Sequence, residues 1–266
     1  AAHLREFREQ HGLDEVVVLN LSSTEPPVDP HEAHNDIEAL MAALDKGTAI
    51  LPPSSLYALA AIETGCAFID FTPSTGARLP AIEQLAAESG VPIGGSDGKT
   101  GETLLKTALA PMFAARAMRV RSWSGMNILG GGDGEALANP VRARSKLASK
   151  GRCLDEILGY PVEAPVRIEH VRDMGEWKTA WDHITFEGFL GTRMRMQFTW
   201  EGCDSALAAP LLIDLARLGA LALRRGEAGL IVPLAFFFKD PAGTNEHALH
   251  RQYEMLRSWV AEPVSV

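Results

Sequence analysis

Cysteine is scarce in this sequence. Of 266 residues only Cys66, Cys153 and Cys203 are cysteines, and no Cys-x-x-Cys pair occurs. An odd and widely spaced set of this kind excludes the disulfide framework on which small secreted domains depend. We therefore expect reduced thiols and a cytoplasmic location.

The sequence also lacks a long apolar run. The run from Leu230 to Phe238 falls far short of the roughly 20 residues that cross a bilayer. The N-terminus begins with a charged helical pattern around Leu4 and Phe7 in place of a signal peptide. We expect no membrane association.

An excess of basic residues is missing as well. There are 25 Lys and Arg against 34 Asp and Glu, for a net charge of −9. Binding to nucleic acid needs a clustered basic face, so we expect no nucleic-acid partner. The pairs His31/His34 and His247/His250 have no metal-ligand spacing and are interpreted as surface residues, so no metal site is expected.

What is present describes an ordinary soluble globular protein, with 46% apolar and 22% charged residues. Strands and helices alternate along the first part of the chain, a pattern typical of an α/β parallel sheet. Polar turns follow the strands at the edge where such sheets bind ligands. The predicted strands are 15–20, 67–71 and 91–93, and the predicted helices are 35–44, 56–64 with a serine N-cap, 79–89 and 104–118.

After residue 119 the pattern changes to period-two alternation of apolar and polar residues, which indicates antiparallel strands with one covered face. We expect a second, α+β domain inserted here. The predicted strands are 118–123, 166–171, 184–189 and 192–200. A helix at 206–223, an apolar strand at 230–238 and a helix at 246–260 then return to the first domain.

A nicotinamide-binding domain normally begins with a strand, a Gly-x-Gly-x-x-Gly turn and a helix. No such motif occurs before Ser22. The parallel-sheet domain is therefore predicted to be an incomplete Rossmann-like domain whose N-terminal part is missing. The expected limits are 1–100 for this domain, 101–205 for the inserted catalytic and oligomerisation domain, and 206–266 for the return.

Two glycine-rich stretches precede a pair of lysines. The stretch Gly94 to Thr103 leads into a helix whose free N–H groups would attract a phosphate. The stretch Asn127 to Gly134 has the composition of a turn that packs closely on a neighbour. Lys146 and Lys150 then follow at an i,i+4 spacing, which places both ammonium groups on one helix face.

Five motifs in one order resemble the myo-inositol-1-phosphate synthases, also called inositol-3-phosphate synthases. The similarity runs from about Val16 to Lys239. The motifs are Gly-x-Asp-x-Lys-Thr-Gly-x-Thr from Gly95, Asn-x-Leu-Gly-x-x-Asp-Gly from Asn127, Arg-Ser-Lys-x-x-x-Lys from Arg144, Gly-x-x-Lys from Gly175 and Asp-Ser-x-Leu-Ala-Ala-Pro from Asp204.

The resemblance implies an NAD-dependent isomerase. The family converts D-glucose 6-phosphate to 1D-myo-inositol 3-phosphate, in inositol and phospholipid biosynthesis, by oxidation at C5, intramolecular aldol cyclisation and reduction by the same cofactor. It also implies a homotetramer. The developing enolate and alkoxide need cations in a dry pocket, which lysines would supply.

The resemblance also implies a set of site residues. The expected catalytic residues are Lys146, Lys178, Lys239, Asp204 and Asp97. The expected substrate phosphate-binding residues are Thr100, Gly101, Glu102, Thr103, Leu129, Gly131 and Lys150. The expected cofactor-binding residues are Ser22, Ser23, Thr24, Ser54, Ser55, Thr72, Gly95, Asp97 and Asp133.

Simpler interpretations of these residues stay open. A lysine is usually a solvated surface residue, Asp133 before Gly134 is an ordinary turn signature, and Asp204 could be a helix N-cap. The chain also departs from the family pattern at Ser96, Gly131, Gly132 and Cys203, which leaves the exact phosphorylated substrate open. The alternatives are a two-domain NAD-dependent oxidoreductase on another sugar phosphate and a non-catalytic sugar-phosphate-binding module.

Overall fold

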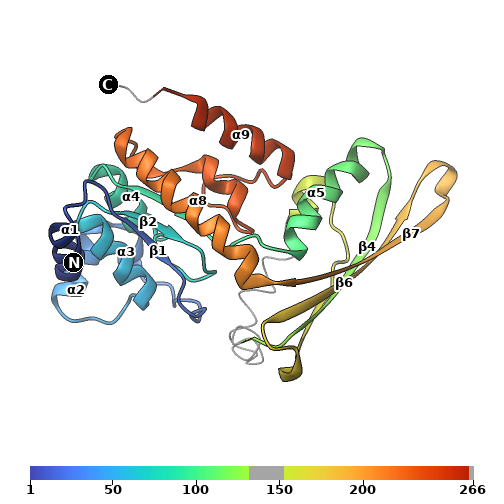
Figure 1. Cartoon of the computed structure of the whole chain (residues 1–266), viewed down its shortest axis with the longest axis horizontal. Helices are drawn as coiled ribbons and strands as arrows, with labels where there is room; N and C mark the ends of the chain where they lie inside the picture. Colours follow the sequence, from blue (N-terminus) through green and yellow to red (C-terminus); the bar gives the residue numbers. More distant parts are fainter. Residues whose placement is uncertain (132–152, 264–266) are drawn as a thin grey trace.

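The computed structural model describes residues 1–131 and 153–263. Two four-stranded sheets lie one beyond the other, and the second extends away from the helices that surround the first (Figure 1). The predicted α/β fold class is confirmed: one sheet is parallel and the other belongs to an α+β unit.

The first sheet has the strand order β1-β2-β3-β8, and every neighbouring pair is parallel. Side chains alternate between its faces, so that Phe68 packs against one group of helices and its neighbour Ile69 against the other. Both faces are therefore buried, as the continuous apolar runs predicted. The strands are β1 (Val17–Asn20), β2 (Ala67–Asp70), β3 (Pro92–Gly95) and β8 (Gly229–Leu230).

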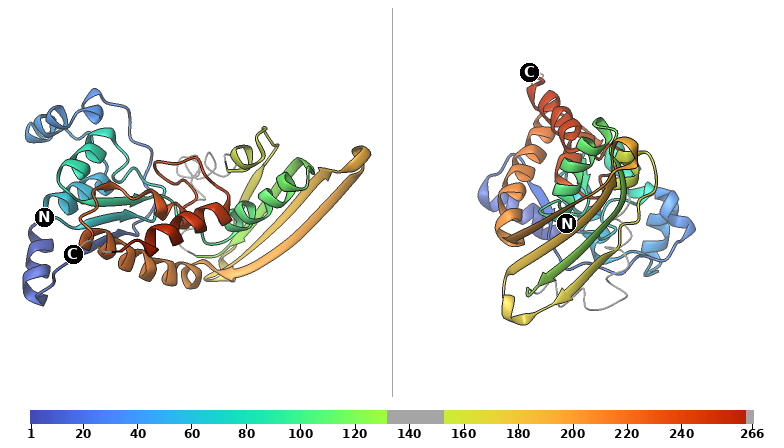
Figure 2. Two further views of the ribbon diagram at one scale, coloured as in Figure 1. Left: turned by 90° about the horizontal axis from the view of Figure 1, so that it is seen from above. Right: turned by 90° about the vertical axis from the view of Figure 1, so that its right-hand side faces the viewer.

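Helices cover both faces of this sheet (Figure 2). One face carries α2 (Ile37–Asp45), α3 (Pro53–Glu63) and α4 (Pro80–Glu88). The other face carries α8 (Asp204–Arg224), the 3₁₀ segment η4 (Val232–Phe237) and α9 (Leu249–Ala261). Gly219 lets α8 approach closely, because a Cβ there would stand 3.0 Å from Val17.

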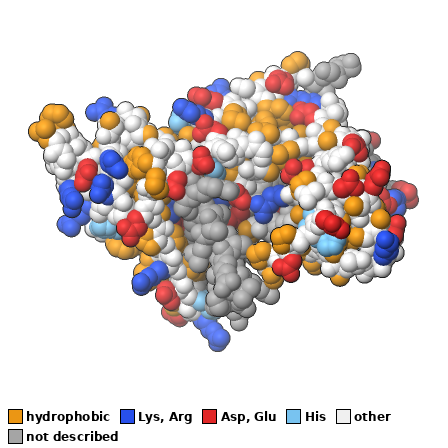
Figure 3. Space-filling model, turned by 180° about the vertical axis from the view of Figure 1, so that it is seen from behind, with side chains coloured by type: hydrophobic (Ala, Val, Ile, Leu, Met, Phe, Trp, Pro, Cys, Tyr) orange, Lys and Arg blue, Asp and Glu red, His pale blue; other side chains and the backbone are white. Residues whose placement is uncertain are grey.

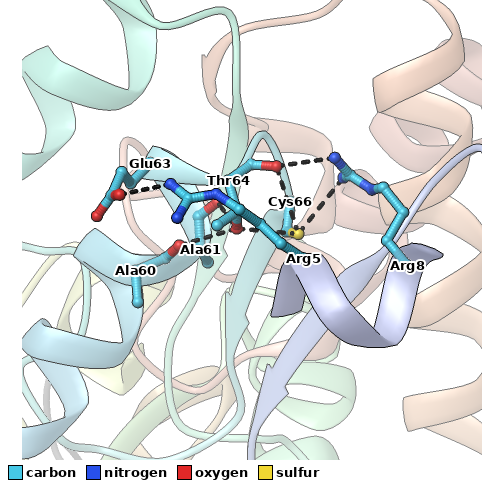
Figure 4. Close-up of polar contacts among 7 residues, drawn as sticks. All are labelled: Arg5, Arg8, Ala60, Ala61, Glu63, Thr64 and Cys66. Carbon is cyan, nitrogen blue, oxygen red and sulfur yellow. Dashed lines mark hydrogen bonds and ion pairs between the residues drawn. The ribbon is translucent and has the colours of Figure 1, made fainter. Parts of the chain in front are cut away.

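The N-terminal helix α1 (Ala2–His11) is attached by two arginines (Figure 4). Arg5 pairs with Glu63 at 2.6 Å. Arg8 donates to the carbonyl oxygens of Thr64 at 3.0 Å and Gly65 at 3.2 Å. These carbonyls end α3, where helix carbonyls lack intrahelical partners, so α1 satisfies groups that α3 leaves open.

The second sheet has the order β5-β4-β6-β7. Helix α5 (Glu102–Ala115) packs on it and shares a core that includes Phe113, Trp123 and Ile184. A short helix at 153–158 contributes to the same core. The strands are β4 (Arg119–Leu129), β5 (Val166–His170), β6 (Trp177–Glu187) and β7 (Arg193–Cys203).

Two predictions about strands are wrong. The second sheet is mixed, because β4 and β5 are parallel while β4–β6 and β6–β7 are antiparallel. The segment 230–238 is not a strand, since pairing ends after Leu230 and η4 begins at Val232. Pro233 stands in the first turn of η4, where its missing N–H costs nothing.

Smaller differences concern termini and burial. Helix α3 begins with Pro52 as N-cap instead of a serine, and α8 has Cys203 as N-cap with Asp204 as its first residue. Asn127 lies inside β4 and not in a turn. His34 and His247, predicted at the surface, are 5% and 3% exposed.

In the described part of the chain, α8 is long and apolar enough to cross a membrane by length and composition, which the sequence analysis did not anticipate. This is weak support for a membrane span, because core helices pass the same criterion. Leu215 and Ala222 of α8 are buried against the parallel sheet, and 17% of the apolar window is buried in the described structure.

Candidate active site

A pocket of about 370 Å³ opens at the carboxyl end of the parallel sheet. The strands β1, β2 and β3 end here. The turns after them meet the start of α8 and Lys239, which follows η4 and its C-cap residue Phe238. This edge is where open parallel sheets bind ligands. Its lining residues are Leu21, Ser22, Ser23, Thr24, Phe71, Thr72, Pro73, Asp97, Gly98, Thr100, Asp204, Ser205, Ala208 and Lys239.

Lys239 and Asp97 form the first charged pair of the pocket. The Lys239 Nζ lies 2.9 Å from Oδ1 of Asp97, whose Oδ2 is buried without a hydrogen-bond partner. The backbones are joined too, since the Lys239 N–H donates to the Asp97 carbonyl oxygen at 2.7 Å. The turn after β3 thereby fixes an ammonium group at the pocket wall, although 142 residues separate the two in sequence.

Lys178 and Asp204 form the second charged pair. The Lys178 Nζ lies 3.2 Å from Oδ2 of Asp204, and the Thr100 hydroxyl donates to Oδ1 at 3.3 Å. Burial alone would raise the pKa of Asp204, but the ammonium groups of Lys178 and Lys239 and these hydrogen bonds lower it below its usual value. Asp204 is therefore an anion that pairs with Lys178 and feels the charge of Lys239.

The start of α5 lies beside this carboxylate. Gly101 is the N-cap residue and makes no side-chain cap. A Cβ on Gly101 would stand 3.9 Å from Oδ1 of Asp204, so the first turn of α5 faces the second charged pair. Thr103 and Glu102 are buried, and the backbone N–H groups of a first helical turn have no intrahelical acceptors.

The second glycine-rich stretch meets Lys178 through strand pairing. Leu129 at the end of β4 is the antiparallel partner of Lys178 in β6. A Cβ on Gly130 would stand 2.6 Å from backbone atoms of Gly175, which is the close packing predicted for this stretch. Gly131 is half-buried beside them. The predicted site residues Lys146, Lys150 and Asp133 lie outside the described residues.

The predicted cofactor residues divide into two groups. Ser22, Ser23, Thr24, Thr72 and Asp97 line the pocket. Gly95 lies inside β3, and Ser54 and Ser55 are fully buried. Ser54 donates to the Glu25 carboxylate and Ser55 donates to the Gly76 carbonyl oxygen. These three residues are absent from the pocket lining.

The hydroxyl and backbone groups of Ser22, Ser23, Thr24 and Thr72 fit one side of a dinucleotide, because ribose hydroxyls and a carboxamide take such partners. They lie at the strand ends where Rossmann domains hold a nucleotide. No glycine-rich cradle for a pyrophosphate precedes them in the sequence.

Two buried lysines near the site were not among the predicted site residues. Lys106 is fully buried and pairs with Glu102 at 2.6 Å. Lys99 donates to Oε1 of Gln252 at 2.5 Å, and burial lowers its pKa to about 7. The i,i+4 spacing of Glu102 and Lys106 could have indicated their pairing, but not their burial.

Comparisons with known proteins agree on one family. The family model described as myo-inositol-1-phosphate synthase, an NAD-binding domain by its name, matches residues 1–261. The inositol-3-phosphate synthase 1 of Bacteroides thetaiotaomicron is 36% identical over 265 residues, which is 96% of this chain and 61% of that protein. The inositol-3-phosphate synthase of Drosophila melanogaster is 34% identical over 83% of this chain and 41% of that protein.

Solved structures give the same result. The inositol-3-phosphate synthase of Caenorhabditis elegans superimposes with a TM-score of 0.89 at 27% identity, over 97% of this chain and 55% of that one. A myo-inositol-1-phosphate synthase-related protein of Thermotoga maritima has a TM-score of 0.84 at 28% identity, over 98% of this chain and 70% of that one. The chain spans about half the length of the curated relatives it matches.

Proposed function

Because this chain belongs to the myo-inositol-1-phosphate synthase family, we propose that its pocket is the active site of an inositol-3-phosphate synthase, an isomerase that converts D-glucose 6-phosphate to 1D-myo-inositol 3-phosphate. The relatives of similar sequence carry this name. This chain spans only part of the length of those relatives, so the activity of the whole protein is part of the proposal.

One observation carries the proposal. Lys178, Lys239, Asp97 and Asp204 come from four segments far apart in the sequence and form two ion pairs. Asp97, Asp204 and Lys239 line one pocket, and Lys178 reaches it through its contact with Asp204. The start of α5 opens toward the same place. Cations for a developing oxyanion thus lie beside a helix start for the substrate phosphate, which is the combination that an aldol cyclisation of a sugar phosphate requires.

The two lysines would divide the chemistry. We place Lys239 near the C5 oxygen, with Lys146 as its expected companion, and Lys178 near the aldehyde oxygen at C1. At these positions an ammonium group stabilises the negative oxygen of the enolate and of the cyclised alkoxide, and can return a proton to it. Asp97 and Asp204 hold the lysines in place and keep them charged.

The substrate phosphate would bind the first turn of α5, with Thr100 and Gly101 at its start and Lys150 as the expected further cation. NAD, when bound along the strand ends, supplies the reversible hydride transfer at C5. The hydroxyls after β1 and β2 would orient it. We also propose the domain limits 1–100, 101–205 and 206–266, supported by the return of β8 and α8 to the first sheet.

The open face of the second sheet supports a homotetramer as the assembly. Trp177 and Trp181 are 60% and 40% exposed, and Phe189 and Leu190 at the β6–β7 turn are each 87% exposed. Figure 3 shows hydrophobic side chains at the far end of this sheet. Exposed apolar groups of this kind mark interaction surfaces. We also propose that the enzyme acts in the cytoplasm, in inositol and phospholipid biosynthesis.

The test is an assay of the natural protein that contains this chain, with glucose 6-phosphate and a catalytic amount of NAD. Formation of inositol phosphate without net NADH release is the expected result. Net NADH release would favour the second candidate, a two-domain oxidoreductase on another sugar phosphate, which the departures at Ser96, Gly131 and Cys203 keep in view. Binding of the substrate without turnover would indicate a non-catalytic module.

A further inference from the structure

We propose that Lys106 is a positioning residue that sets phosphate affinity, by neutralising the Glu102 carboxylate at the start of α5. The inference rests on the proposed function of that helix start. Lys106 touches neither the pocket nor the expected ligand, since it is absent from the lining and fully buried. Its effect would pass through Glu102.

The contacts are short and buried. The Lys106 Nζ lies 2.6 Å from Oε1 of Glu102, with 0% and 3% of the two side chains exposed. The other carboxylate oxygen, Oε2, accepts from the Asn127 side chain at 2.7 Å. Asn127 itself is 1% exposed in β4. The carboxylate of Glu102 is therefore turned toward the second sheet and held at both oxygens. The phosphate-binding role predicted for Glu102 falls to its backbone N–H, which Glu102→Gln keeps.

A second carboxylate lies close by. A Cβ on Gly125 would stand 2.8 Å from Oε1 of Glu102 and 3.5 Å from Oδ1 of Asp182. Asp182 is fully buried and accepts from the Trp123 indole at 2.7 Å. Lys106 thus supplies a positive charge to Glu102 at a place where two buried carboxylates are neighbours.

Glu102 lies at the helix start where the substrate phosphate is expected to bind. Glu102 is the first residue of α5 after Gly101, and the phosphate is expected at the N–H groups of that same first turn. Two anions at one helix start repel each other in a buried environment. Lys106, one turn further on, removes this repulsion, so the helix start can accept a dianion although it carries a glutamate.

The experiment compares three variants of the natural protein. Lys106→Met removes the charge and keeps most of the apolar stem, Glu102→Gln removes the carboxylate charge, and the double variant removes both. The dissociation constant of inorganic phosphate is measured by titration calorimetry, and the KM of glucose 6-phosphate by inositol phosphate formation. The affinity for NAD is measured as a control, to show that the rest of the site is intact.

Lys106→Met is expected to weaken phosphate binding and raise KM by roughly ten- to a hundredfold, with kcat and NAD affinity little changed. The double variant is expected to return both to within about threefold of wild type. A lysine that mattered only for packing would not be rescued by Glu102→Gln. Should Lys106→Met fail to fold, Glu102→Gln decides, because the charge of Lys106 is then no longer balanced by its partner and should tighten phosphate binding by roughly tenfold; an unchanged phosphate affinity overturns the inference.

A folded Lys106→Met protein with wild-type phosphate affinity overturns the inference. A folded double variant that still binds phosphate tenfold more weakly does so too, as does a wild-type protein that binds no phosphate. A wild-type protein that binds inorganic phosphate but forms no inositol phosphate overturns the proposed function alone.

Discussion

The Nζ of Lys178 lies 3.2 Å from Oδ2 of Asp204, although Lys178 belongs to β6 of the second sheet and Asp204 begins α8 on the first. The strand partner of Lys178 in β7 is Gly202, two residues before Asp204. The pair therefore stands where the chain passes from the second sheet to the first. The geometry of the proposed site depends on how this junction holds the two sheets together.

Replacing Lys178 with Ala is expected to lower inositol phosphate formation by roughly a thousandfold, because the oxyanion at C1 loses its cation. Stability should change by less than about 1 kcal/mol, since the ion pair is partly exposed. Turnover and urea unfolding are measured together, with the exposed Lys46→Ala as control. Turnover near wild type would refute the role assigned to Lys178.

Asp97→Ala is expected to destabilise the protein more than Asp204→Ala. The Asp97 side chain is 5% exposed and that of its partner Lys239 is 15% exposed, so loss of the carboxylate breaks a largely buried ion pair, at a cost of about 3 kcal/mol. The Asp204 side chain is 43% exposed, and its loss should cost about 1 kcal/mol. Urea unfolding of both variants checks the order, and equal losses would contradict it.

The parallel sheet could be predicted because its strands are continuous apolar runs and its helices have clear periodicity. Phe68 and Ile69 are both apolar since each faces a different layer of helices. The mixed sheet could be predicted only in part. Alternation along β4 and β5 shows which face is covered, but the direction of a neighbouring strand depends on the connection between them.

Local ambiguity explains the wrong strand at 230–238. A short apolar run fits a buried strand and a buried turn of helix equally well, and tertiary packing on β3 and α9 decides here. Lys178, Asp97 and Asp204 could be predicted from the order of the motifs, and Lys239 from the family resemblance, before their pairing was known. Lys106 and Lys99 could not, because no periodicity distinguishes a buried lysine from a solvated one.

Gly98→Ala is expected to destabilise the protein by about 1–3 kcal/mol. A Cβ at Gly98 would stand 2.1 Å from Cζ of Phe71, whose ring packs edge-on against the buried Phe238 with centroids 6.4 Å apart. The ring would have to move, and Phe71 lines the pocket, so the KM should rise as well. Thermal unfolding measures the loss of stability, and the rate of inositol phosphate formation gives the KM.

Gly131→Ala is the matched control, because the nearest described neighbour of its Cβ would be Glu176, at an ordinary 3.5 Å. It should cost no more than about 0.5 kcal/mol. Equal stabilities of the two variants would mean that Phe71 turns aside freely, and that Gly98 is not needed for the shape of the pocket.

Asp70 at the end of β2 is expected to make stability depend on pH. Burial raises its pKa from 3.8 to about 6, against hydrogen bonds from Thr72 and Asn20 and the charge of Arg78. The folded protein therefore keeps a proton that the unfolded chain has already lost. This contribution to stability is complete below pH 3.8 and is lost as the pH rises through about 6.

Asp70→Asn removes the titration and keeps an oxygen that can accept from Thr72 and Asn20. Relative to wild type, the free energy of unfolding of the variant should increase by about 2 kcal/mol between about pH 4.5 and pH 8. Comparison across pH cancels any fixed effect of the amide on packing near Gly76. Urea unfolding at each pH gives the difference. The exposed Asp45→Asn should show no such change. A difference that is constant with pH would mean that Asp70 ionises in the folded protein as it does in the unfolded chain, and that its hydrogen bonds outweigh its burial.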